Sequence, residues 1–306
     1  MTSLLLLEQA LNGLQFGVML FLMAAGLTLV FGIMDLVNLA HGSLYMMGAY
    51  FAATFIDWTG SFLLGAALAL PAALLLGVLL ELVAVRNLYS RDHLDHVLAT
   101  FGLILFFNEL VRLVWGPEGR TILLPEALAT WVELIPGVPY PAYRFVIIGV
   151  GLACAVFLWW LVNRTRLGML IRAGASNREM VGALGVDIKL LYTFVFGIGA
   201  ALAGLAGLMA APITTVNIGM GENILILAFV VIVIGGIGSV RGAFIGAVLV
   251  GMVDTIGRAF LPILFGAFLP PQFASAAGPA IASVAIYVLM AVVLFVKPQG
   301  LFPARG

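Results

Sequence analysis

Long apolar runs recur along the whole chain, and they constrain its fold more than any other feature of the sequence. The first run, from Leu11 to Ile33, is long enough to cross a bilayer, since a spanning helix needs about 20 predominantly apolar residues. Of the 306 residues, 63% are hydrophobic and 9% are charged, whereas soluble domains carry about 25% charged residues. The sequence therefore predicts an all-α, polytopic integral membrane protein.

The apolar runs predict eight or nine membrane spans in a single transmembrane domain, residues 1–306. They cover residues 11–33, 44–56, 62–85, 98–115, 145–162, 190–212, 222–234, 243–256 and 276–296. Residues 116–143 hold many prolines and a single basic residue, which predicts an outer loop, because basic residues concentrate in cytoplasmic loops. Residues 262–272 are expected to form a second outer loop, and residues 164–190 an inner one.

The inner loop is the most basic stretch of the chain. Its charged residues are Arg164, Arg166, Arg172, Arg178, Lys189, Glu179 and Asp187. A segment with this many charges does not cross hydrocarbon. We call Arg164–Lys189 the basic segment.

A short amphipathic helix is predicted inside the basic segment. Ser176 and Glu179 have the spacing of a capping box, so the helix is expected to begin at Asn177. Gly185 is expected to end it in the left-handed conformation. Helical spacing places Met180, Val181 and Leu184 on one face, so the helix presents an apolar stripe in a basic surround. Such a helix is typical of a contact with another protein.

A polar stretch, residues 34–43, interrupts the apolar pattern after the first span. It contains Asp35, Asn38, His41 and Ser43, with no lysine or arginine. Two interpretations are open: a plain short turn, or a broken helix that lines a cavity at membrane depth. A metal site from Asp35 and His41 is disfavoured, because no third ligand lies nearby.

Other polar residues have structural explanations. The cluster Asp92, His93, Asp95 and His96 is interpreted as a helix cap at the membrane surface rather than a metal site. Four carboxylates, Asp35, Glu81, Glu109 and Asp254, are candidates for sites in a span. Arg112 and Arg258 stand three and four residues after Glu109 and Asp254, at pairing distance on a helix.

Two glycine patterns favour packing and turns over chemistry. Gly199, Ala203, Gly207 and Ala211 recur every four residues, a spacing that lets helices approach closely in lipid. The glycines of the stretch VIGGIGSVRG, residues 233–242, resemble a dinucleotide fingerprint, but the flanking runs are membrane-length and uncharged, without an alternating βαβ pattern. A tight inner turn between two spans is expected there instead.

Motifs for catalysis are missing from the sequence. Neither lysine follows a glycine, so no Walker A motif exists, and no nucleophile elbow, HExxH or CxxC occurs. We therefore expect a protein that is not an enzyme and that binds no cofactor of its own.

Several segments together resemble a known family. GLTLVFGIMDLVNLAHGSLYMMGAY, LGMLIRAGASNREMVGALGVD, VIVIGGIGSVRGAFIGAVLVG and the terminal KPQGLF are similar, in this order, to the permease subunit of branched-chain amino acid ABC importers of the LivH type. The resemblance implies that Arg172, Ala173, Asn177 and Gly185 belong to the loop that docks on an ATPase subunit. Val181 departs from the alanine that is frequent in the family.

The same resemblance implies a setting. It implies a place near the translocation pathway for Asp35, Asn38, His41 and Ser43, and a coupling role for the segment that also contains Ser176 and Glu179. It further implies a second related permease, two ATPase subunits that bind ATP, an extracytoplasmic binding protein, and a multi-pass location in the bacterial inner membrane.

Two alternatives stay open from the sequence. Relatives of this pattern also carry urea, short amides or other small solutes, so the substrate is the least constrained expectation. A stand-alone ion-coupled secondary transporter is the alternative of another class, and it requires a buried carboxylate in mid-span that titrates or binds a cation.

Overall fold

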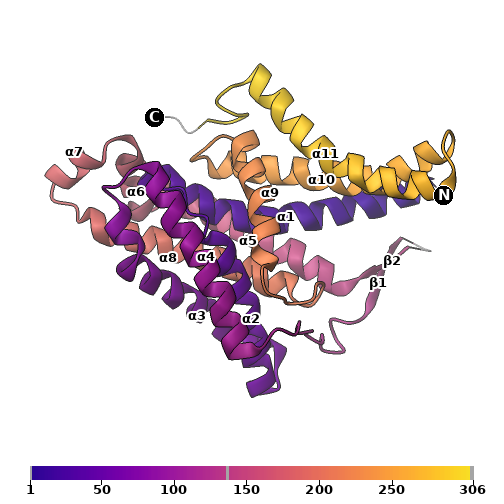
Figure 1. Cartoon of the computed structure of the whole chain (residues 1–306), viewed down its shortest axis with the longest axis horizontal. Coiled ribbons are helices and arrows are strands. Elements are labelled where there is room, and N and C mark those ends of the chain that lie inside the picture. The colour runs from indigo at the N-terminus through magenta and orange to yellow at the C-terminus, as the bar shows by residue number, and fades with distance from the viewer. Residues whose placement is uncertain (1, 136–137, 304–306) are drawn as a thin grey trace.

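In the computed structural model, residues 2–135 and 138–303 are described, and they form a helical bundle with one short β-hairpin (Figure 1). The elements are α1 (Thr2–Met34), α2 (His41–Thr59), α3 (Phe62–Val83), the 3-10 helix η1 (Val85–Leu88), α4 (His93–Trp115), β1 (Trp131–Ile135), β2 (Val138–Pro141), α5 (Ala142–Arg164), α6 (Arg166–Ser176), α7 (Arg178–Ala183), α8 (Ile188–Ala210), α9 (Met220–Gly235), α10 (Val240–Gly266) and α11 (Pro271–Val296). The helical fold class is confirmed. The antiparallel pair β1–β2, inside the predicted outer loop, was not expected.

Seven helices in the described part of the chain are long and apolar enough to cross a membrane: α1, α3, α4, α5, α8, α10 and α11. The remaining two predicted runs correspond to α2 and α9. α9 is apolar but has only 16 residues, and α2 is buried over most of its length. The difference between seven and the expected eight or nine spans therefore lies in two helices inside the bundle.

One predicted loop boundary is wrong. Residues 262–266, expected in an outer loop, form the last turn of α10, which continues to Gly266. Pro262 is tolerated inside this helix because its ring packs against Gly278 of α11, where no side chain stands in the way. A proline in a span is acceptable when a neighbouring helix covers the backbone it disturbs.

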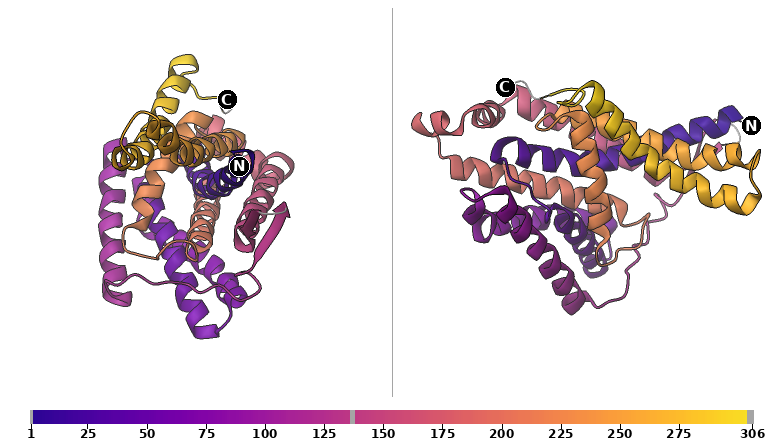
Figure 2. Two further views of the ribbon diagram at one scale, coloured as in Figure 1. Left: turned by 90° about the vertical axis from the view of Figure 1, so that its right-hand side faces the viewer. Right: turned by 45° about the horizontal axis from the view of Figure 1, so that its top comes forward.

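α1 is the axis of the bundle. Figure 2 shows it in the centre, with the other helices arranged around it. In the most apolar 18-residue stretch of α1, 83% of the residues are buried inside the protein, and in that of α8 72% are buried. In the corresponding stretches of α10 and α11 only 17% of the residues are buried. Two long helices thus form the core, and the outer helices leave their apolar faces to lipid or to a partner.

Glycine lets α8 press directly on its neighbours. A Cβ on Gly48 of α2 would overlap the backbone of Gly204, and a Cβ on Gly207 would overlap the carbonyl of Tyr45. A Cβ on Gly26 of α1 would lie 2.6 Å from the carbonyl oxygen of Gly199. These contacts confirm the predicted close packing by small residues on α8. Close contact matters here because lipid tails are as apolar as the helices, so there is no hydrophobic driving force between helices.

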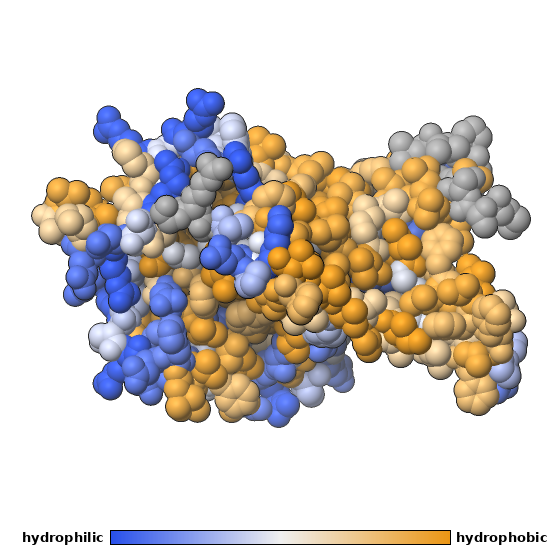
Figure 3. Space-filling model, turned by 90° about the horizontal axis from the view of Figure 1, so that it is seen from above, coloured by the Kyte–Doolittle hydropathy of each residue, from blue (hydrophilic) through white to orange (hydrophobic). Residues whose placement is uncertain are grey.

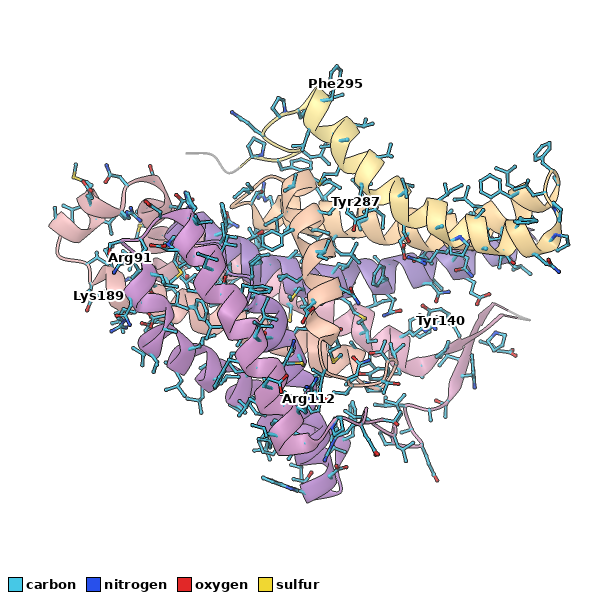
Figure 4. All side chains as sticks on the ribbon, in the orientation of Figure 1. Arg91, Arg112, Tyr140, Lys189, Tyr287 and Phe295 are labelled. Carbon is cyan, nitrogen blue, oxygen red and sulfur yellow. The ribbon has the colours of Figure 1, made fainter. Side chains whose placement is uncertain are left out.

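The two ends of the bundle differ in polarity. In Figure 3, hydrophilic residues gather around α6 and α7, while apolar residues cover the middle and the far side. Arg91 and Lys189 lie together at this end, and Arg112 and Tyr140 lie away from it (Figure 4). We call the end that carries α6 and α7 the basic end.

The glycine contact predicts a stability difference. We expect Gly48→Ala to lower the melting temperature of the purified protein in detergent, because the added methyl overpacks the α2–α8 contact at a cost of about 1–3 kcal/mol. Gly102→Ala in α4 is the matched control, since nothing lies within 4 Å of its added Cβ and alanine favours a helix. Equal melting temperatures for the two variants would contradict the packing argument.

Candidate functional site

The basic segment folds into two helices, where the sequence predicted one. Thr165 begins α6 by accepting a hydrogen bond from the amide of Gly168, at 3.0 Å. Asn177 caps the N-terminus of α7, since its Oδ1 accepts a hydrogen bond from the amide of Met180 at 2.9 Å. Gly185 follows α7 in the left-handed conformation, with φ of +87°, as expected.

The predicted capping box is wrong by one residue. Ser176 is the last residue of α6, and α7 begins at Arg178 rather than at Asn177. Asn177 has the extended backbone of an N-cap, with φ of −155° and ψ of 94°, and asparagine is among the residues most favoured at this position. The asparagine therefore displaces the serine as the cap.

The apolar stripe of α7 divides into a buried part and an exposed part. Val181 is 6% exposed and faces inward, while Met180 is 59% exposed and Leu184 is 78% exposed. Neither of these two large apolar side chains is covered by its own chain. Met180 and Leu184 thus form an exposed apolar pair, which is the chemistry of a contact with another protein.

The exposed pair belongs to a segment with more basic than acidic residues. Arg172, Ser176, Asn177, Arg178 and Glu179 are exposed around it. Arg172 donates a hydrogen bond to the carbonyl of Val162, which ties α6 to the end of α5. Within the described residues, the ion pairs all lie outside the basic segment, so its guanidinium groups have no carboxylate partner there.

The polar stretch after α1 is a broken helix. Residues 35–40 are not helical, and the ring of His41 at the start of α2 has its Nε2 3.2 Å from the carbonyl oxygen of Met23. Met23 precedes Met34, the end of α1, by eleven residues, or about 16 Å of helix. The chain therefore returns deep into the bundle before α2 begins. The connection between α1 and α2 is thus non-helical and, apart from Asp35, covered at least in part by protein.

The four polar residues of this break do not share one surface. Asp35 is exposed, has a φ of +52°, and lies 3.9 Å from Nε2 of His93. Asn38, His41 and Ser43 are buried. Neither amide atom of Asn38 has a hydrogen-bond partner in the described structure. The sequence grouped these residues by proximity along the chain, whereas the fold separates an exposed carboxylate from a buried polar set.

The candidate carboxylates inside spans have basic or polar partners. Glu109 and Arg112 are 3.1 Å apart, and Asp254 and Arg258 are 2.8 Å apart, which confirms both predicted helix pairs. Glu81 is fully buried and is paired with Arg86 at 3.2 Å. Burial, together with the hydrogen bond that Tyr89 donates to Glu81, raises the pKa of Tyr89 above its ordinary value, so this phenol stays a neutral donor.

The sequence identified Glu81 as a candidate carboxylate in a span but did not predict all of its contacts. Its pairing with an arginine was anticipated, but its contact with Thr193 of α8 joins residues far apart in sequence. No local pattern signals such a contact.

The glycines after α9 form a turn, as expected. Gly236 and Gly238 both have positive φ, 104° and 79°, and Ser239 begins α10 by accepting the amide of Gly242 at 3.1 Å. The C-terminal segment packs into this turn, where the amides of Leu301 and Phe302 each donate to the end of α9 at 2.9 Å. Backbone hydrogen bonds occupy the place that a dinucleotide fingerprint would need open.

Comparisons with known proteins agree with this architecture. A family model described as the permease component of a branched-chain amino acid transport system matches residues 9–295. BraD of Pseudomonas aeruginosa, a high-affinity branched-chain amino acid transport system permease protein, is 33% identical over 265 residues, which cover 82% of this chain and 86% of that protein. No solved structure matches the chain.

Other relatives show the breadth of the family. LivH of Escherichia coli, a high-affinity branched-chain amino acid transport system permease protein, is 28% identical over 309 residues, covering 96% of this chain and 94% of that protein. LsrD of Salmonella paratyphi B, an autoinducer 2 import system permease protein, is 27% identical over 201 residues, covering 61% and 58%. The predicted identity as a multi-pass transport subunit of the cell membrane, rather than an enzyme, is confirmed. The chain belongs to the family of permease components of branched-chain amino acid transport systems.

Proposed function

We propose that this protein is the membrane permease subunit of an ABC importer for leucine, isoleucine and valine. In this proposal an extracytoplasmic binding protein delivers the solute, two separate ATPase subunits supply the power, and a second related permease completes the pathway. The names of BraD and LivH support the substrate class. The absence of a Walker A motif from the sequence supports a separate ATPase.

The observation that carries the proposal is the exposed apolar pair of α7 within a cationic surround. An ATPase in a separate subunit needs a contact that transmits its movement to the permease. Met180 and Leu184 provide the apolar part of that contact. Charged groups around them set orientation and association rate. The basic end faces the cytoplasm in this proposal, because it carries the basic segment with its four arginines and one lysine.

The proposed coupling residues divide by accessibility. Arg172, Ser176, Asn177, Glu179 and Gly185 are exposed and available to an ATPase surface, Ala173 is half-buried, and Val181 is buried. We assign direct contact to the exposed residues. Ala173 and Val181 hold α6 and α7 against the rest of the chain.

The proposed pathway begins at the broken helix. Asn38 carries two buried polar atoms without partners, and leaving such groups unpaired costs about 1–3 kcal/mol. That cost is removed when water or a polar solute reaches the amide, so we place Asn38, with His41 and Ser43, beside the solute route. Asp35, exposed at the end of α1, stands at the entrance or exit of this route.

The secondary-transporter alternative has little support among the described residues. It requires a carboxylate in a span that is free to bind an ion. Glu81, Glu109 and Asp254 each pair with an arginine, and Asp35 lies at the surface near His93. The alternative that the permease carries a different small solute has a specific observation in its favour, the similarity to LsrD. Urea and short amides remain within this alternative.

The cap of α7 gives a test of the segment's structure. We expect Asn177→Ala to speed hydrogen exchange at the amides of Met180 and Val181 about fivefold, because an N-cap contributes about 1 kcal/mol. Ser176→Ala is the matched control and should leave exchange unchanged, since α7 is capped one residue later. Faster exchange in the serine variant alone would restore the capping box.

The coupling role predicts a loss of transport. Leu184→Asp is expected to reduce ATP-dependent leucine uptake by at least about tenfold, because it removes apolar contact and places a charge in the proposed interface. Leu123→Asp, at a leucine that is 86% exposed outside the basic end, is the control and should transport normally. Normal uptake by Leu184→Asp with correctly inserted protein would refute the coupling contact.

The substrate class has its own measurement. In vesicles that hold the permease with its ATPase and binding subunits, we expect uptake of radiolabelled leucine to be inhibited by isoleucine and valine but not by urea or acetamide. Inhibition by urea or acetamide would favour the alternative substrate. Uptake by the purified permease alone in liposomes would instead indicate the secondary transporter.

A further inference from the structure

A buried carboxylate at the basic end joins four segments of the chain. Glu81 stands in the last turns of α3 and is fully buried. Arg86 of η1 approaches it with two nitrogens, Nε to Oε1 and Nη2 to Oε2, each at 3.2 Å. Tyr89 donates its hydroxyl hydrogen to Oε1, and Thr193 of α8 lies 2.8 Å from Oε2. We call Glu81, Arg86, Tyr89 and Thr193 the Glu81 clamp.

The clamp reaches the basic segment through Thr193. The Thr193 hydroxyl lies 2.9 Å from the carbonyl oxygen of Lys189, in the first turn of α8, and it accepts a hydrogen bond from Nη2 of Arg86 at 2.9 Å. A hydroxyl has one hydrogen, so it serves Glu81 or Lys189 at any moment. The first turns of α8, which include Lys189 at the end of the basic segment, are therefore bound through one side chain to the end of α3.

The clamp also reaches the broken helix. The rings of Tyr89 and Tyr192 meet edge to face with centroids 5.0 Å apart. The Tyr192 hydroxyl lies 3.4 Å from the carbonyl oxygen of Ile33, next to the end of α1. The start of α8 thus contacts α1 as well as α3, beside the point where the helix breaks.

Burial of Glu81 makes the Glu81 clamp costly to open. A carboxylate away from water is tolerated only when it is paired and its remaining lone pairs accept hydrogen bonds. Glu81 meets this condition with three partner side chains from η1, the η1–α4 connector and α8. Movement of α8 away from α3 leaves the carboxylate short of donors, so the fold resists that movement.

We propose that Glu81 is a positioning residue that makes α3 and the start of α8 move as one body when the coupling helix α7 is displaced. The inference rests on the proposed coupling function and deepens it by assigning the route from α7 into the membrane helices. α8 then carries the displacement inward, because it packs backbone to backbone against α1 and α2.

The first test measures coupling in the assembled transporter. Glu81→Gln keeps the shape of the side chain and removes its charge. We expect ATPase subunits to stay bound and to hydrolyse ATP, while leucine uptake per ATP hydrolysed falls by about tenfold, a typical size for coupling between sites. Glu109→Gln is the matched control, since it removes a carboxylate from an exposed arginine pair and such pairs contribute little. Equal transport per ATP in Glu81→Gln and the native protein would overturn the proposal.

The second test measures the shared movement directly. Spin labels replace Val83 of α3 and Leu190 of α8, both exposed, after the single cysteine is removed as Cys154→Ser. We expect the distance between labels to stay the same with and without ATP in the otherwise native transporter. The same distance should change on ATP binding when Glu81→Gln is present. A distance that changes with ATP while Glu81 is intact would overturn the proposal.

Two gentler variants keep the test informative if Glu81→Gln does not fold. Thr193→Val and Tyr89→Phe each remove one donor, and each should lower uptake per ATP without releasing the ATPase subunits. Native uptake per ATP in both would overturn the clamp while leaving the coupling contact intact. Failure of the coupling contact itself appears differently, as normal uptake by Leu184→Asp.

Discussion

Contact between helix backbones is the constraint on which this structure depends. Gly48 and Gly204, and Gly26 and Gly199, bring α2 and α1 against α8 with no side chain between them. In a bilayer the surrounding lipid is as apolar as the protein, so dispersion at close contact decides which helices associate. Leu36, Asn38 and Ala40, in the non-helical stretch between α1 and α2, are buried in the same bundle, and non-helical backbone has no place in hydrocarbon without such cover.

In the proposed mechanism, the same core receives any displacement of the basic end. α7 is a short helix beside an exposed apolar pair, and by itself it has too few contacts to displace the membrane helices. Its chain continues directly into α8, one of the two most buried long helices. Interfaces packed this closely are bistable rather than continuously deformable, so a small displacement at one end is carried as a rigid-body shift. The coupling that we propose depends on this property.

The sequence predicted what depends on local patterns. Hydropathy located the apolar helices, the spacing of small residues located the face of α8 that packs, and Gly185 marked the end of α7. It failed where two local signals compete, as when Asn177 displaced Ser176 as the cap of α7. It also failed where a distant partner decides, as when Gly278 made room for Pro262 inside α10.

The candidate site divides in the same way. Charge and spacing predicted an apolar face on a basic segment, but they did not separate Val181, which is buried, from Met180 and Leu184, which are exposed. The depth of His41 and the contact between Glu81 and Thr193 depend on how α1, α3 and α8 cross. The positions at which helices cross depend on the packing of the whole bundle, and no local pattern in the sequence predicts them.

The hydrogen bonds from Leu301 and Phe302 to the end of α9 bear on the order in which this protein is completed. The turn at Gly236 and Gly238 emerges from the ribosome well before the residues that close it. The last carbonyls of α9 therefore gain these two hydrogen-bond donors only after residues 301 and 302 have been synthesised.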